Sequence, residues 1–237
     1  MSRRNRRKGA SSRRYYLVGV AFAAVAIAIY ALASSPPGGK ASAGSEPVIL
    51  YVDQGNGAVN GSNFRTMLST ATSHGFNTIF FQVYRSGTLL FSNGSLGRFV
   101  ESAHSQGLEI FFALYFTNST QTIPLSIFSD GEDGISLDMS ALPVGAQITL
   151  FDYLSSNYPG RTAITTTDPT LPLTPDLLVL ETYAPGDQQY IHHGMVAGVE
   201  VAATSSRQDY DQQVGYALRN SDGVMVFDYH GLVKAGY

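Results

Sequence analysis

Residues 78–116, TIFFQVYRSGTLLFSNGSLGRFVESAHSQGLEIFFALYF, decide the fold of this chain. The apolar runs Thr78–Tyr84 and Glu109–Phe116 are rich in β-branched and aromatic residues, which predicts two strands. Between them, Leu96–Gln106 has apolar residues three or four apart, as in an amphipathic helix, and Gly107 suits the turn that ends it. Near-continuous apolar strands are typical of parallel sheets covered by helices, so the stretch predicts a strand–helix–strand unit.

The same alternation continues on both sides of this unit and predicts eight strands: Val48–Asp53, Thr78–Tyr84, Glu109–Phe116, Gly134–Ser140, Thr162–Thr167, Leu177–Tyr183, Val196–Ala203 and Val224–Tyr229. The clearest helices are Asn63–His74, Leu96–Gln106, Val144–Asn157 and Gln208–Asn220. The links after the third, fifth and sixth strands are too short or too rich in proline for full helices. The pattern predicts an α/β fold, a small (β/α)8 TIM-type barrel. The alternative is a doubly wound open sheet, but Gly55, Gly57 and Gly61 lack the spacing of its phosphate-binding turn.

Acidic side chains stand where several of these strands end, and chemistry in such barrels takes place at the carboxyl ends of the strands. Side-chain alternation in Gly134–Ser140 and Leu177–Tyr183 turns Asp138 and Glu181 toward the barrel interior. A charge buried there is costly unless it is paired or solvated. Asp138 and Glu181 are therefore the candidate catalytic residues, because two carboxylates in one cleft are the minimum for cleaving a glycosidic bond.

Other side chains near strand ends are candidates for binding substrate: Asp53, Gln82, Tyr84, Arg85, Tyr115, Asn118, Tyr183, Glu200, Asp228 and Tyr229. For the acids the alternative is structural, as helix caps, as partners of Arg85 or Arg161, or as a solvated rim. The tyrosines offer ring faces to sugars, although aromatic residues at strand ends also close cores. The chain has no cysteine, and His192 and His193 lack further residues at ligand spacing, so we expect neither a metal nor a cofactor.

Charge divides the chain into two parts. The first forty residues carry eight Lys and Arg and no acid, whereas from Glu46 onward eighteen Asp and Glu face seven Lys and Arg. An acidic body lacks the electrostatic footprint of a nucleic-acid-binding protein, so we expect no nucleic-acid partner.

The basic start is explained by membrane topology. Residues 15–33, YYLVGVAFAAVAIAIYALA, are uncharged and long enough to cross a bilayer. The sequence predicts one N-terminal transmembrane helix at 15–33, a basic cytoplasmic tail at 1–14, a flexible linker at 34–46 and an extracytoplasmic barrel at 47–237. If 15–33 is instead a cleaved signal peptide, the barrel is secreted.

Residues 77–92 and 103–116 resemble the second and third strands of glycosyl-hydrolase-like TIM-barrel families of largely uncharacterised function. Those families often have a fourth strand of the form D-G-I-x-x-D-x-x-R-x-P. Asp133, Asp138 and Pro143 match it, with Ala141 in place of Arg. The resemblance covers about the first half of the barrel and implies a protein that acts on or binds carbohydrate.

The same segment is distantly similar to the family-18 chitinase motif D-G-x-D-x-D-x-E, with Ser136 and Ser140 in place of the middle Asp and the catalytic Glu. We therefore expect a membrane-anchored, glycoside-hydrolase-like barrel that acts on or binds extracellular polysaccharide. The departure from the motif implies the alternative, a catalytically inactive barrel that binds glycan or serves as an envelope structural protein. A third alternative is a membrane-complex subunit without a ligand of its own.

Overall fold

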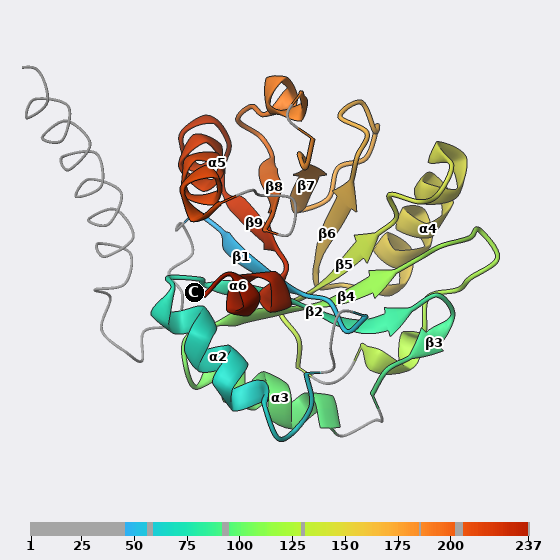
Figure 1. Ribbon diagram of the computed structural model, residues 1–237. Helices are drawn as coiled ribbons and strands as arrows, with labels where there is room; N and C mark the ends of the chain where they lie inside the picture. The colour runs from blue at the N-terminus through green and yellow to red at the C-terminus, as the bar shows by residue number, and fades with distance from the viewer. Residues whose placement is uncertain are drawn as a thin grey trace, which may run out of the picture. The chain divides into compact units, whose positions relative to one another are not determined.

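Eight parallel strands close into a barrel in the computed structural model, which describes residues 46–55, 59–91, 95–128, 131–184, 186–201 and 206–236 (Figure 1). The strands are β1 (Val48–Val52), β2 (Thr78–Arg85), β4 (Glu109–Tyr115), β5 (Gly134–Asp138), β6 (Arg161–Thr166), β7 (Leu177–Glu181), β8 (Val196–Glu200) and β9 (Val224–Phe227). Neighbours pair in the order β1-β9-β8-β7-β6-β5-β4-β2, and β1 pairs with β2 to complete the ring. The two-residue β3 (Thr88–Leu89) forms a hairpin with β2. The predicted TIM-type barrel is confirmed, and the open sheet is excluded.

Helices lie outside the ring where amphipathic patterns predicted them. They are α2 (Phe64–Ser73), α3 (Ser95–His104), α4 (Val144–Asn157) and α5 (Arg207–Asn220). Short 3-10 turns, η1 (Leu125–Ile127) and η2 (Asp187–Tyr190), follow β4 and β7, and no helix forms between β6 and β7. Three links are therefore short of a full helix, as the sequence predicted.

One helix was not predicted. The apolar pattern predicted that the last strand extends to Tyr229, but β9 ends at Phe227 and α6 (Tyr229–Ala235) begins two residues later. Asp228 caps this helix, because its Oδ1 accepts a hydrogen bond of 2.9 Å from the backbone N–H of Gly231. Gly236 ends the helix in the left-handed conformation that glycine favours.

Side-chain alternation divides the buried apolar residues between two cores. The smaller core fills the barrel interior and consists of Ile49, Tyr51, Phe80, Phe111, Ala113, Ala163, Val179, Val196 and Met225. The larger lies between the strands and the helices and includes Leu137 and Met139. Because these two residues face the helices, Asp138 between them faces the interior, as the alternation predicted.

A bulge breaks the alternation in β2. The pairing register with β4 shifts between Gln82 and Tyr84, so that Val83 and Tyr84 both lie in the outer core. Arg85, the next residue, is then directed to the carboxyl end of the barrel interior.

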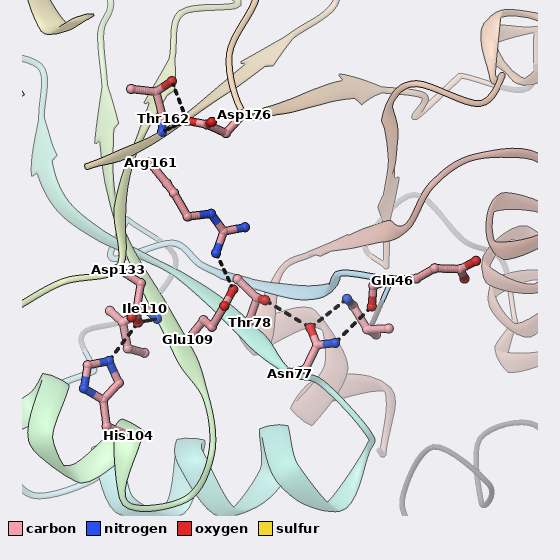
Figure 2. Close-up of polar contacts among 11 residues, drawn as sticks. Glu46, Asn77, Thr78, His104, Glu109, Ile110, Asp133, Arg161, Thr162 and Asp176 are labelled. Carbon is pink, nitrogen blue, oxygen red and sulfur yellow. Dashed lines mark hydrogen bonds and ion pairs between the residues drawn. The ribbon is translucent and has the colours of Figure 1, made fainter. Parts of the chain in front are cut away.

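Polar contacts hold the opposite, amino-terminal end of the barrel together (Figure 2). Asp133, just before β5, accepts hydrogen bonds of 2.7 Å from the Ile110 N–H and from His104 Nε2. Arg161 pairs with Glu109 at 2.9 Å, which ties β6 to β4. Asp133, the first acid of the motif that resembles glycosyl hydrolases, therefore has a structural position far along the strand from Asp138.

The predicted tail and membrane segment, 1–33, lie outside the described residues, as does the linker up to residue 45. Among the helices that are described, none has the length and apolar character needed to cross a bilayer.

Candidate active site

A pocket of about 230 Å³ opens at the carboxyl ends of the strands. The ends of β1, β2, β4, β5, β7 and β9 supply its lining: Tyr51, Asp53, Gln82, Arg85, Tyr115, Asp138, Ser140, Glu181, Tyr183 and Phe227. The pocket therefore gathers side chains that are far apart in the sequence, including both candidate catalytic carboxylates.

Asp138 is the last residue of β5, and only 7% of it is exposed. Its Oδ2 accepts a hydrogen bond of 3.4 Å from the Tyr51 hydroxyl, and its Oδ1 accepts one of 3.2 Å from the Ser140 hydroxyl. Burial raises the pKa of Asp138 to about 6, because it disfavours the charged form more than these two donors stabilise it.

Glu181 ends β7 and is half-buried. Burial, followed by the negative charge of Asp138, raises the pKa of Glu181 to about 8, although the Tyr183 hydroxyl donates a 3.4 Å hydrogen bond to its Oε1. Between pH 6 and pH 8, Asp138 is therefore mainly ionised and Glu181 mainly protonated.

A third carboxylate in the pocket, Asp53, is held in an ion pair. Its Oδ1 lies 2.7 Å from Arg85 Nη1 and accepts a second hydrogen bond, also of 2.7 Å, from the Gly55 N–H. The Arg85 guanidinium also lies over the ring of Tyr115, 5.4 Å from its centre. Asp138 and Glu181 form no ion pair with any described residue, which leaves them available for proton transfer.

Aromatic rings form one wall of the pocket. Phe227 lies 5.1 Å from the ring of Tyr51 and 5.9 Å from that of Tyr183, measured between ring centres. Rings at such a mouth offer apolar faces to the C–H face of a sugar.

Seven of the predicted site residues meet in this pocket: Asp53, Gln82, Arg85, Tyr115, Asp138, Glu181 and Tyr183. Three further lining residues were not predicted as site residues: Tyr51, Ser140 and Phe227. The period of two could have found the first two, since Tyr51 precedes Asp53, and Ser140 follows Asp138, by two positions.

Five predicted residues lie outside the pocket lining: Tyr84, Asn118, Glu200, Asp228 and Tyr229. Tyr84 packs in the outer core, its ring 5.3 Å from that of Phe116, because the β2 bulge turns it outward. Asn118 is exposed in a loop, where its Oδ1 accepts hydrogen bonds from Thr120.

The other three occupy the β8 and β9 ends. Asp228 caps α6, and Tyr229 packs in the outer core. Glu200 ends β8, and its charge contributes to the raised pKa of Glu181. Within the part of the chain that the structure describes, no group of three or more His, Asp or Glu residues is arranged to hold a metal ion.

The fold and the site together define a (β/α)8 barrel with two carboxyl groups at its mouth, Asp138 and Glu181, whose pKa values are about 6 and about 8. Neither a family model nor a curated protein matches the sequence. Solved structures with a similar fold include the maltogenic α-amylase AmyB from Thermotoga neapolitana, with a TM-score of 0.51, 11% identity and coverage of 77% of this chain and 67% of that one. They also include CpGH84B, with a TM-score of 0.50, 7% identity and coverage of 77% and 44% respectively. At this identity the likeness shows the fold alone, a TIM-type barrel, which is the fold that the resemblance implied.

Proposed function

We propose that this chain is a glycoside hydrolase of extracellular polysaccharide, with Glu181 as the general acid and Asp138 as its ionised partner. The observation that carries the proposal is the gathering of two carboxyls in one pocket, with pKa values of about 6 and about 8. Pairs of titratable groups whose environments separate their pKa values are typical of acid–base catalysis.

In the proposed reaction, protonated Glu181 donates its proton to the glycosidic oxygen as the bond from that oxygen to the anomeric carbon breaks. Ionised Asp138 stabilises the positive charge that develops on the sugar, either by attacking the anomeric carbon or by activating a water molecule. Water supplies the hydroxyl of the new reducing end. If Asp138 has attacked, water breaks the bond between Asp138 and the anomeric carbon and gives its other proton to Glu181. If Asp138 has activated the water, Asp138 takes that proton, and proton exchange with solvent returns both groups to their starting states. The Tyr51 and Ser140 hydroxyls support this step by orienting the Asp138 carboxylate.

Residues 15–33 are proposed to anchor the barrel on the outer side of a membrane. The proposal rests on their lack of charge and on the Lys and Arg residues before them, which favour a cytoplasmic tail. Protease treatment of intact cells tests it. A barrel that is digested from outside while the cell stays sealed supports the topology, and a protected barrel overturns it.

Hydrolysis of a broad glycan panel tests the catalytic proposal. The full chain in detergent should release reducing ends from at least one glycan, and Asp138→Asn or Glu181→Gln should lower kcat by about 10²- to 10⁴-fold. The matched control is Asp152→Asn, which removes an exposed acid on α4 and should leave the rate unchanged. A parent protein without turnover on any glycan of the panel overturns the catalytic proposal.

The second candidate function is a glycan-binding barrel without catalysis. It is favoured by Ser140, which stands where the chitinase motif carries its catalytic Glu and which instead donates a hydrogen bond to Asp138. Glycan-array binding that persists in the parent without any turnover identifies this function.

A further inference from the structure

A second and larger pocket, of about 480 Å³, lies at the first turns of α2 and α3 and shares no residue with the mouth pocket. Its apolar lining includes Phe81, Phe91 and Phe99. Phe81 stacks on Phe99 with ring centres 4.1 Å apart and lies 5.1 Å from Phe91. The three rings form an aromatic floor, in which Phe81 and Phe99 are buried and Phe91 is the ring most open to solvent.

Two arginines line the same pocket. Arg65 is the second residue of α2 and Arg98 the fourth of α3, and both are exposed. Neither forms an ion pair with a described residue, whereas Arg85 and Arg161 do. Two of the seven basic residues after Glu46 thus meet in one pocket of an acidic body.

Positive charge gathers at the first turns of α2 and α3. The first turn of a helix carries partial positive charge and favours acidic side chains, but the first turns of α2 and α3 contain none. The helix ends and the guanidinium groups add their positive charge in the same place. The pocket is therefore suited to a ligand that carries negative charge.

We propose that this pocket binds an acidic sugar unit, one that carries a carboxylate, sulfate or phosphate group. The acidic group would pair with Arg65 and Arg98, and the apolar face of the sugar ring would lie against the phenylalanine floor. α2 comes after β1, and α3 comes after β2 and its hairpin partner β3, so both helices belong to the connections that leave the carboxyl ends of barrel strands, where the mouth pocket opens. A polysaccharide could thus occupy both sites, although binding here does not depend on catalysis at the mouth.

Titration calorimetry of the full chain in detergent with a galacturonate tetrasaccharide tests the proposal. Arg65→Gln and Arg98→Gln should each weaken binding about tenfold, the value of one charge-assisted contact. Arg219→Gln, which removes an exposed arginine of α5 outside the pocket, is the matched control and should leave the affinity unchanged. Equal weakening by Arg219→Gln would mean nonspecific charge attraction and would overturn the site.

Three further measurements separate the parts of the proposal. A neutral galactose tetrasaccharide should bind at least tenfold more weakly, and equal binding overturns the role of charge. Phe91→Leu should weaken binding of the tetrasaccharide but not of inorganic phosphate, and an equal effect on both, or none on either, overturns the role of the floor. Binding should persist in Asp138→Asn, which distinguishes this site from the mouth pocket, and its loss there assigns the ligand to the mouth and overturns the second site.

Discussion

At neutral pH Asp138 is mainly ionised and Glu181 mainly uncharged, because the barrel buries both carboxyls and Asp138 ionises first. The rate of hydrolysis should therefore rise as pH passes through about 6, where Asp138 ionises, and fall through about 8, where Glu181 loses its proton. A pH series of kcat/KM on the best glycan of the panel measures both limbs. A rate that keeps rising above pH 9 would exclude Glu181 as the acid.

The coupling of the two groups gives a second prediction at the residue scale. The charge of Asp138 contributes to the raised pKa of Glu181, so Asp138→Asn should lower that pKa. Carboxyl-carbon NMR titration of the labelled protein measures the change without any turnover. Asp53→Asn is the comparison, because Asp53 is not among the causes of the Glu181 shift. A Glu181 pKa that stays the same in Asp138→Asn would mean that the two groups are not coupled.

Tyr51 is predicted to set the charge state of Asp138. Its hydroxyl donates to the Asp138 carboxylate and lowers the pKa of that group, so Tyr51→Phe should move the acidic limb of the pH–rate profile to higher pH. The alkaline limb should stay in place, and kcat/KM at pH 6 should fall by about tenfold or less. Tyr115→Phe, in the same pocket but without a hydrogen bond to Asp138, is the control. A uniform loss of rate with an unmoved acidic limb would assign Tyr51 a packing role only.

Alternation along a strand was enough to place Asp138 and Glu181, because each follows an uninterrupted period of two. The same reasoning failed for Tyr84, since the sequence around Gln82 gives no sign of the bulge that turns Tyr84 outward. Bulges depend on pairing with a neighbouring strand, which a single strand's sequence does not encode.

At the scale of elements, long amphipathic helices were predictable and the short α6 was not. Seven residues directly after an apolar strand offer little periodicity, and only Asp228 and Gly236 mark the two ends. Asp228→Ala should therefore lower the free energy of unfolding by about 1 kcal/mol through loss of the cap. Thermal unfolding followed by circular dichroism measures this effect, and Asp152→Ala, which removes an exposed acid within α4, is the comparison. An unchanged melting temperature would contradict the capping role.

At the scale of the whole molecule, closure of the barrel was inferred from the count of strands and not from any single segment. Each strand is compatible with an open sheet, and only the pairing of β1 with both β2 and β9 distinguishes the two folds. The mouth pocket exists because of this closure, since it brings β1 beside β9 and β2. Tyr51 and Phe227 lie on the paired strands β1 and β9, and their rings are in contact. This contact was not predicted, because the sequence alone does not show that the first and last strands pair.

Closure also links the two mouth carboxyls to the stability of the entire barrel. Their folded-state pKa values, about 6 and about 8, lie above the ordinary values of 3.8 and 4.5. The folded protein therefore binds these protons more tightly than the unfolded chain, so their stabilising contribution is complete below pH 4 and is lost as pH rises through 6 and then 8.

The double variant Asp138→Asn, Glu181→Gln lacks this dependence. Between pH 5 and pH 9, the melting temperature of the parent should fall by about 4 °C or more beyond that of the double variant, since 1 kcal/mol corresponds to roughly 2–4 °C at this size. The control is Asp152→Asn with Glu101→Gln, two exposed acids whose removal should leave the parent's dependence on pH intact. Parallel curves for the parent and the mouth variant would show that burial at the mouth does not raise these pKa values, and the assignment of Glu181 as the acid would lose its physical basis.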